Sequence, residues 1–317
     1  MSVQDTAGPG PQQEQAMNAA SAWRLALARR VSSPYVENPK LAAMIVGGSV
    51  SRGHADRFSD LEIGGFWHEP PTDEERLAAA TVVATSTGGE VQRIYPYDPA
   101  EEVWEEGIFL GRAAPDRPST GLLVEIPHYT VDFMERTLTD VLDRYDTSDA
   151  KQSILSVLLS AIPLHGEALV LLWRSRAAEY PRGLALAMIA KHAQIDHFWR
   201  TEMFPERANS LLLYDTYVHV ARKLLYTLLA LNRVYYSGFK WLALQVSRMQ
   251  IVPDDFSTRL DRIFQAEPQV ASHQLAQLVE ETYTLIEQHM PEVDVAWLRH
   301  VFRYRREPWE GPPTYLS

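Results

Sequence analysis

Two different periods of apolar residues follow one another along this chain, and the change comes near residue 147. Before that point, short apolar runs typical of strands alternate with segments of helical spacing. The predicted strands lie at 41–46, 61–66 and 121–126, and the predicted helices at 20–32 and 73–86. This mixture indicates an α/β unit that we place at residues 17–147.

After residue 147 the helical period continues almost without interruption. Apolar residues recur at intervals of three and four in four stretches, and prolines separate the stretches. They cover residues 154–159, 184–199, 211–236 and 275–289. We therefore expect an α/β core followed by an all-α bundle of six to eight helices at residues 148–317. Because ligand sites often form where domains meet, the active-site cleft is expected at the junction of the two halves.

The first 16 residues differ in composition from the rest of the chain. They are rich in Gly, Pro and Gln and contain no periodic apolar pattern. Such a composition is typical of a disordered tail. We exclude residues 1–16 from the predicted fold.

The first predicted strand, at 41–46, ends at a turn of small residues. Gly47 and Gly48 allow the backbone to turn tightly, and Ser49 follows them. Small residues also let the main chain approach a phosphate group closely, and the polar residues 51–58 are expected to form a short helix after the turn. This pattern predicts a phosphate-binding turn.

Two acidic residues follow at the start of the second predicted strand. Asp60 and Glu62 are separated by one residue, so in an extended chain their side chains share one face. Two carboxylates on one face repel each other unless a cation lies between them. Mg²⁺ prefers one or two protein carboxylates together with phosphate and water oxygens. The pair therefore indicates a site for a divalent metal ion and a phosphorylated substrate.

The spacing of these residues matches a known signature. Gly48-Ser49, ten further residues and then Asp60-x-Glu62 resemble the motif of the DNA polymerase β-type nucleotidyltransferase superfamily. The variant Ser59-Asp60-Leu61-Glu62 is similar to the small-molecule branch that includes the kanamycin nucleotidyltransferases. The resemblance implies transfer of a nucleoside monophosphate from a triphosphate, with ATP as the expected donor, to a hydroxyl of a small acceptor, with release of pyrophosphate. It also implies two Mg²⁺ ions, or Mn²⁺ in their place.

The resemblance further implies a third carboxylate on a later strand, and two residues compete for that role. Glu125 lies between Val124 and Ile126 in an apolar strand, the pattern expected of the third ligand. Asp132 follows Thr130, a good helix N-cap, and is expected in the first turn of a helix, where the dipole favours an acid. We assign Glu125 as the third ligand and keep Asp132 as the alternative.

Three further residues are candidates for binding the nucleotide. Arg52, in the turn after Ser49, could neutralise phosphate charge or be an ordinary surface arginine. The stretch Leu231 to Trp241 resembles a Leu-Asn, Tyr, Lys pattern of a bacterial subgroup of these enzymes. Within it, Gly238 is expected to end one helix and Lys240 to open the next, so that Lys240 could reach the triphosphate. Asn232 would fix the turn or contact a ribose hydroxyl.

Other types of active site find no support in the sequence. Gly48 and Gly53 have P-loop spacing, but His54-Ala55 replaces the required Lys and Ser/Thr. The chain has no cysteine and no HExxH motif, which excludes thiol nucleophiles, disulfides and that class of zinc site. His192 and His197 are five residues apart and fall on different faces of a helix, so we interpret them as packed or surface residues.

The net charge of −11 bears on the acceptor. An acidic surface repels nucleic acid, so a nucleic-acid partner is not expected and a small molecule is favoured. The acidic stretch 98–106 could attract a cationic acceptor, but a solvated helix face is the simpler interpretation. The general base for the acceptor hydroxyl is left open among three acids of the helical half. They are Asp196, Glu202 and Asp215.

Two alternatives to this function stay open. The acceptor could be tRNA or a protein, which would require a basic surface beside the cleft. The chain could also be a non-catalytic binding or scaffold protein. No membrane span or secretory signal is visible in the sequence, so we expect a cytoplasmic protein, and the resemblance leaves a homodimer open.

Overall fold

A computed structural model describes residues 17–111, 121–306, 308 and 311 of the chain. The chain forms two compact units, Met1–Tyr180 and Pro181–Ser317, and each is described here by itself. The first contains a mixed sheet with helices and the second contains helices, so the expected fold class is confirmed. The predicted tail at residues 1–16 lies outside the described residues.

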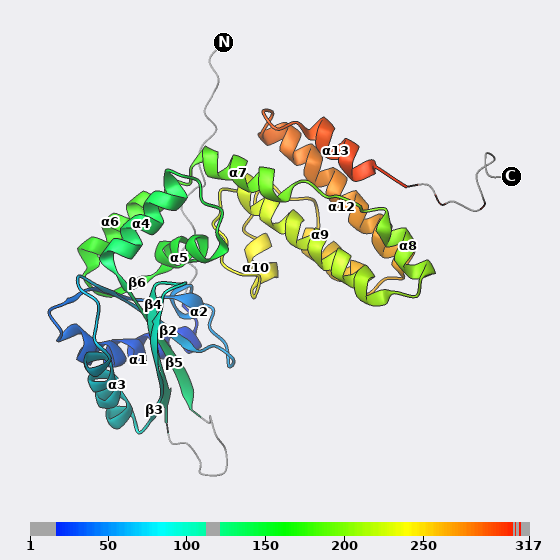
Figure 1. The fold of residues 1–317 in the computed structure, drawn as a ribbon. Coiled ribbons are helices and arrows are strands. Elements are labelled where there is room, and N and C mark those ends of the chain that lie inside the picture. The colour runs from blue at the N-terminus through cyan, green and yellow to red at the C-terminus, as the bar shows by residue number, and fades with distance from the viewer. Residues whose placement is uncertain (1–16, 112–120, 307, 309–310, 312–317) are drawn as a thin grey trace. The chain divides into compact units, whose positions relative to one another are not determined.

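The first unit is built on a six-stranded sheet with the strand order β3-β4-β5-β2-β1-β6 (Figure 1). Only β2 and β5 pair in parallel, and the other four pairs are antiparallel. Its elements are α1 (Ala19–Val36), β1 (Leu41–Val46), α2 (Gly48–Ser51), β2 (Leu61–Trp67), α3 (Asp73–Thr87), β3 (Glu90–Asp98), β4 (Val103–Leu110), β5 (Leu122–Thr130), α4 (Val131–Leu142), α5 (Asp149–Ser160), β6 (Ile162–His165) and α6 (Glu167–Ala177).

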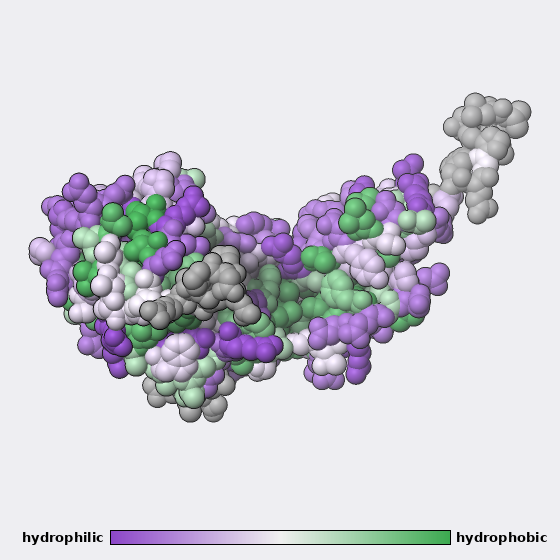
Figure 2. Space-filling model, turned by 90° about the horizontal axis from the view of Figure 1, so that it is seen from below, coloured by the Kyte–Doolittle hydropathy of each residue, from purple (hydrophilic) through white to green (hydrophobic). Residues whose placement is uncertain are grey.

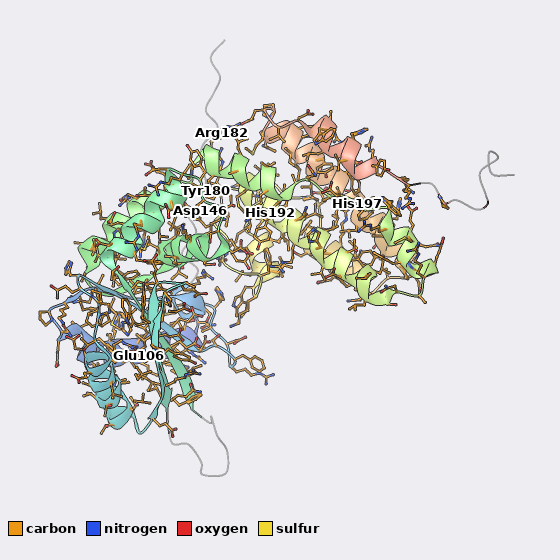
Figure 3. The ribbon with its side chains drawn as sticks, in the orientation of Figure 1. Glu106, Asp146, Tyr180, Arg182, His192 and His197 are labelled. Carbon is orange, nitrogen blue, oxygen red and sulfur yellow. The ribbon has the colours of Figure 1, made fainter. Side chains whose placement is uncertain are left out.

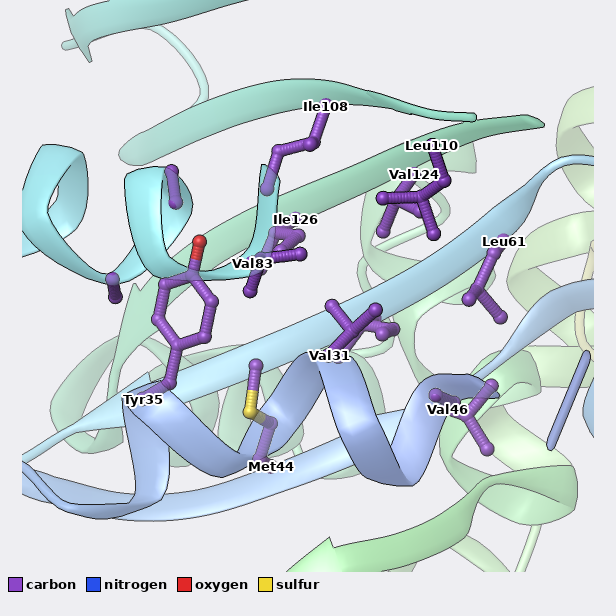
Figure 4. Packing of buried hydrophobic residues seen from close by; sticks show 14 of the residues in the cluster. Val31, Tyr35, Met44, Val46, Leu61, Val83, Ile108, Leu110, Val124 and Ile126 are labelled. Atoms are coloured by element: carbon purple, nitrogen blue, oxygen red, sulfur yellow. The ribbon is translucent and has the colours of Figure 1, made fainter. Parts of the chain in front are cut away.

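One face of this sheet packs against α1 and α3 and holds the main core. Residues at alternate positions of β2 and β5, such as Leu61, Ile63 and Val124, point into it, as the apolar alternation predicts. Val31 and Tyr35 of α1 meet them from the helix side (Figure 4). All five side chains are at least 99% buried, so this face of the sheet is closed to solvent.

Helices α4 and α6 cover the opposite face towards the carboxyl ends of β2 and β5. There the ring of Phe66 packs edge-on against Trp173 of α6, with ring centroids 5.0 Å apart. Tyr129 of β5 stacks on Phe133 of α4 at 4.9 Å. On the same face, Glu62 near the start of β2 and Glu125 in the middle of β5 are half-buried. The fold therefore presents two half-buried acids on this face of the sheet.

The second unit contains seven helices among the described residues. They are α7 (Arg182–His192), α8 (Arg200–Glu206), α9 (Ser210–Leu231), α10 (Leu242–Val246), α11 (Phe256–Ile263), α12 (Pro268–His289) and α13 (Val295–Arg303). Two predicted helices are shorter than expected: the helix at 184–199 stops at His192, and that at 211–236 stops at Leu231. The helix predicted at 275–289 begins earlier, because Pro268 occupies its first turn.

The division between the units falls after Tyr180, later in the chain than the expected boundary at residue 147. The segments between these two positions pack with the sheet. Strand β6 pairs with β1, and α6 contacts both strands. Helical spacing alone assigned α5 and α6 to the second half because it does not reveal what a helix packs against.

Exposed apolar side chains occur in both units. Phe58 in the first unit is 74% exposed and Leu211 in the second is 80% exposed. Figure 2 shows such apolar patches within a largely hydrophilic surface. Among the described residues, no helix combines the length and apolar character needed to cross a bilayer.

Candidate functional site

The predicted phosphate-binding turn directly follows β1 and lies against β2. Gly48 opens the short helix α2 with a φ of +62°, a conformation that favours glycine. A Cβ atom at Gly48 would lie 2.5 Å from Oε2 of Glu62, so the missing side chain gives the carboxylate its place. A Cβ at Gly47 would lie 2.8 Å from Val157 of α5. Both glycines are needed for close packing, and the turn and the carboxylate form one site.

Glu62 and Glu125 are direct neighbours in the sheet. They are register partners in the parallel pair of β2 and β5, so their side chains leave the same face about 4.8 Å apart at the backbone. A glycine is the backbone neighbour of each of the two glutamates. Gly107 of β4 is the register partner of Glu125, and Gly47 donates its N–H to the carbonyl oxygen of Glu62 at 3.0 Å. The sheet therefore presents two carboxylates with little side-chain bulk around them.

Asp60 lies just before β2, in a loop that α1 holds in place. Arg24 of α1 donates from Nη2 to the carbonyl oxygens of Asp56, at 2.9 Å, and Ser59, at 3.0 Å. Burial lowers the pKa of the Arg24 guanidinium, and the charges of Asp56 and Asp60 oppose that effect. Asp60 is therefore close to a buried cation.

The loop itself differs from the short helix expected at residues 51–58. The helix is α2, which ends at Ser51, and turns and irregular backbone follow. The Asp56 side chain accepts the N–H of Phe58 and the hydroxyl of Ser59, so local polar side chains compete with helix formation.

The two candidates for the third carboxylate are clearly separated by the fold. Glu125 lies beside Glu62, whereas Asp132 lies in the first turn of α4 after the N-cap Thr130, as the sequence indicates. Between these two acids, the chain passes from the middle of β5 to its carboxyl end and into the helix. Of the two, only Glu125 is placed next to Glu62.

A ready-made metal site is not among the described side chains. No group of three or more His, Cys, Asp or Glu residues within 17–111 and 121–306 could hold a metal ion as it stands, and this includes the expected group of Asp60, Glu62 and Glu125. Asp60 precedes β2 and lies near Arg24, whereas Glu62 and Glu125 lie within their strands. A carboxylate pair does fit Mg²⁺ that arrives with phosphate oxygens, because this ion commonly uses one or two protein carboxylates.

Ser49 and Arg52 both belong to the turn after β1. Ser49 lies in α2 and is half-buried. Arg52 is the C-cap of α2, and its Nη2 donates to Oγ of Ser156 in α5 at 3.5 Å. The guanidinium of Arg52 is thus held between the turn and α5, rather than extending into solvent.

Asn232 forms hydrogen bonds with the backbone at the end of α9 and in a later segment. Its amide nitrogen donates to the carbonyl oxygens of Leu228, at 2.8 Å, and Ile251, at 2.7 Å. Its oxygen accepts the N–H groups of Gln250 and Ile251. These four hydrogen bonds fix the end of α9 to a later segment, and the contact of Asn232 with a ribose hydroxyl stays a prediction.

Lys240 does not open a helix as expected. Helix α9 ends at Leu231, Gly238 lies in the following loop with a φ of +75°, and α10 begins at Leu242. The longer loop follows from the hydrogen bonds of Asn232, which end α9 early. Lys240 is exposed and belongs to the second unit, so its contact with the triphosphate stays a prediction.

The acidic stretch 98–106 is not a solvated helix face. Residues Val103–Leu110 form β4, where side chains alternate between the two faces of the sheet. Glu106, labelled in Figure 3, is fully buried in the first unit. Glu105 lies on the other face of the sheet, the face of Glu125. Burial, with the nearby Glu106 and Glu101, raises the pKa of Glu105. Glu105 and Glu106 are therefore neighbours in the sequence but lie in two different environments.

The three candidates for the general base lie in the second unit. Asp196 accepts a hydrogen bond from Gln194, and Glu202 forms an ion pair with Arg305. Asp215 lies on α9. Their distance from the carboxylate pair is not defined because each unit is described by itself, and the expected cleft at the junction stays a prediction.

Sequence reasoning missed the polar residues that support this site from within the first unit. Arg24 holds the loop before Asp60 by hydrogen bonds. In the core, His128 of β5 and Glu106 of β4 form a hydrogen bond with each other. A signal for His128 was present, because it continues the buried positions Val124 and Ile126 with a polar residue. A polar residue at a core position indicates a buried hydrogen bond.

Comparisons with known proteins add little beyond the fold. No protein-family model matches the chain, and no curated protein matches it. A nucleotidyltransferase-like protein from Exiguobacterium sibiricum is similar in structure, with 13% identity, a TM-score of 0.35 and coverage of 85% of this chain and 80% of the other. Two structures of the Cid1 poly(U) polymerase, one with its product ApU, have 11% identity and TM-scores of 0.27 and 0.26. Each match covers 46% of this chain and 42% of the other.

Proposed function

We propose that this protein is a metal-dependent nucleotidyltransferase that transfers a nucleoside monophosphate from a triphosphate, with ATP as the expected donor, to a hydroxyl of a small molecule. The observation that carries the proposal is the register pairing of Glu62 and Glu125 beside Gly48. Two adjacent carboxylates and a turn of small residues supply the two halves of such a site.

The residues of this chain have defined parts in the reaction. Glu62 and Glu125 would hold Mg²⁺, or Mn²⁺ in its place, and Asp60 is the third proposed ligand. When bound, these ions neutralise phosphate charge and lower the pKa of the attacking hydroxyl. The backbone of Gly48, the hydroxyl of Ser49 and the guanidinium of Arg52 would bind the terminal phosphates.

The transfer itself exchanges one bond to phosphorus for another. The oxygen of the acceptor hydroxyl forms a bond to the α-phosphorus, the bond from that phosphorus to the bridging oxygen breaks, and pyrophosphate leaves with the bonding electrons. The hydroxyl proton passes to a base. Positioning of the two substrates is the main contribution of the protein to such a reaction.

The small-molecule acceptor is supported by the charge of the chain. Formal net charge is −11, and polyanions such as RNA bind proteins mainly through basic surfaces. Glu105 of β4 is another acid on the face of the sheet that carries Glu62 and Glu125. These charges disfavour a polynucleotide acceptor and favour a neutral or cationic one.

Calorimetric titration of the full chain with each of the four ribonucleoside triphosphates, with and without Mg²⁺, tests the proposal. We expect Mg²⁺-dependent binding of at least one triphosphate, weakened about tenfold or more by Glu62→Gln or Glu125→Gln. Glu105→Gln is the matched control because it removes the same charge from the same face, and it should leave the affinity almost unchanged. Absence of binding to the wild type, or equal binding by the Glu62→Gln variant, would overturn the proposal.

A further inference from the structure

A chain of buried polar side chains connects the two strands that carry the carboxylate pair. Trp67 of β2 donates from Nε1 to Nδ1 of His128 in β5 at 2.9 Å. Nε2 of His128 is therefore the nitrogen that donates to Oε1 of Glu106 in β4, at 2.6 Å. Arg76 of α3 donates to Oε2 of Glu106 at 2.9 Å. One network thus links β2, β5, β4 and α3.

Burying the polar side chains of this network costs free energy. Arg76, Glu106 and His128 are each 0% exposed. Removing charged groups from water costs several kcal/mol for each ion, and well-packed apolar residues often serve stability equally well. Although burial raises the pKa of Glu106, its contacts with His128 and Arg76 outweigh that effect and lower the pKa below the ordinary value. Stability alone therefore does not account for this network.

The alignment of β2 with β5 needs such a determinant. The two strands pair in parallel, and α3, β3 and β4 lie between them in the chain, so no tight turn sets their register. Buried and half-buried residues alternate from Leu61 to Gly65 in β2 and from Leu123 to Tyr129 in β5. A shift of two residues would keep every side chain on its face, yet it would place Glu125 opposite Asp60 or Gly64 instead of Glu62.

His128 distinguishes the native register from these shifted ones. Its register partner is Gly65, and a Cβ atom at Gly65 would lie 2.6 Å from Nδ1 of His128. The imidazole thus occupies the space that glycine leaves, within reach of the Trp67 indole. A shift of two residues would bring His128 opposite Ile63 or Trp67, where a side chain fills that space and the hydrogen bond to the indole is lost.

We propose that His128, fitted over Gly65 and bonded to Trp67 and Glu106, is a positioning residue that locks β2 and β5 in the register that brings Glu62 and Glu125 together. Arg76 holds Glu106 in place from α3, and it also donates to the carbonyl oxygens of Glu105 and Tyr95 in β4 and β3. The consequence for metal and triphosphate binding rests on the proposed function. The register itself does not.

Engineered cysteine pairs report this register directly, because the chain has no cysteine of its own. Adjacent strands bring partner Cα atoms within the range that a disulfide requires. Glu62→Cys with Glu125→Cys should crosslink on oxidation, and Glu62→Cys with Leu123→Cys or Pro127→Cys should not. The pairs are then placed in full-length chains that carry Arg76→Met, Glu106→Leu and His128→Leu together.

We expect the apolar triple variant to remain folded and to lose selectivity, with the shifted pairs crosslinking at the expense of the native pair. A folded triple variant that crosslinks only the native pair would overturn the proposal. Should the triple variant fail to fold, Gly65→Ala provides the milder test, since its methyl group displaces the imidazole. Gly64→Ala is the matched control: its Cβ would meet Ile45 at an ordinary 3.4 Å on the other face, so only the native pair should crosslink.

The functional consequence is measured separately, with both glutamates present. Mn²⁺ and each of the four ribonucleoside triphosphates are titrated into the wild type and the apolar triple variant. The affinity of the variant should be lower by about tenfold or more, while its melting temperature changes little. Loss of selectivity in crosslinking with no binding by the wild type would refute the proposed function and keep the register lock. Equal binding by both chains would refute the link between the lock and the site.

Discussion

Gly48 shows how a single residue joins the backbone to the chemistry of the site. Its left-handed conformation turns the chain after β1, and its lack of a side chain leaves space for the carboxylate of Glu62. Gly88, at the end of α3, has nearly the same φ, +64° against +62°, but a Cβ there would meet nothing within 4 Å. Substitutions at these two glycines therefore distinguish the effect of backbone strain from the effect of crowding beside Glu62.

Alanine at either position should destabilise the protein by about 1–2 kcal/mol, the cost of a left-handed conformation for a residue with a side chain. Only Gly48→Ala should also displace the Glu62 carboxylate and abolish Mg²⁺-dependent triphosphate binding. Urea denaturation gives the free energy of unfolding of both variants, and calorimetry gives their affinity. Equal affinity of Gly48→Ala and Gly88→Ala would show that crowding at Glu62 has no effect on the site.

At the scale of elements, the start of α3 is fixed by a capping box. Thr72 accepts the N–H of Glu75, and Glu75 accepts the N–H of Thr72 at 2.8 Å. Glu75 also accepts from Nζ of Lys40, at the start of β1, at 2.8 Å. The hydrogen bond from Lys40, together with that from Thr72, lowers the pKa of Glu75 to about 2. One carboxylate thus begins the helix and joins it to the sheet.

This lowered pKa predicts a pH-dependent contribution to stability. Because the folded pKa is below the ordinary value of 4.5, ionised Glu75 stabilises the fold at neutral pH, and this contribution is lost as the pH falls from about 4.5 towards 2. The difference in free energy of unfolding between wild type and Glu75→Gln should be largest at pH 7 and shrink below pH 4.5. Glu74→Gln removes an exposed charge from the same turn and should show a smaller difference at pH 7. A difference for Glu75→Gln that is independent of pH would contradict the assignment.

For the whole molecule, the position of the division between the units determines which segments the first unit needs in order to be stable. Strand β6 covers the edge of β1, and Trp173 of α6 is fully buried against Phe66. A chain that ends at residue 147 would lose both, leaving an unpaired strand edge and an uncovered apolar face. The first unit is complete only when α5, β6 and α6 are included.

A fragment of residues 17–180 should therefore unfold in one cooperative thermal transition, whereas a fragment of residues 17–147 should aggregate or melt without cooperativity. Circular dichroism during heating and light scattering distinguish these outcomes. Equal cooperativity of the two fragments would place the boundary of the folding unit at residue 147, as helical periodicity alone indicates.

The sequence by itself determined the features that depend on neighbouring residues. The strand at 41–46, the turn at Gly48 and the shared face of alternate strand residues follow from local backbone geometry, and so does the helix that begins after Thr130. These features were sufficient to predict the fold class and to pair Asp60 with Glu62, whereas Glu125 was chosen as the third ligand through the family resemblance.

Only the tertiary structure decided what depends on contacts between distant segments. It set Glu125 opposite Glu62, buried Glu106 beneath an apparently acidic surface stretch, used Asn232 to end α9 and joined α5 and α6 to the sheet. Local patterns cannot predict these outcomes, because the free energy of each one comes from burial and hydrogen bonds with partners far along the chain.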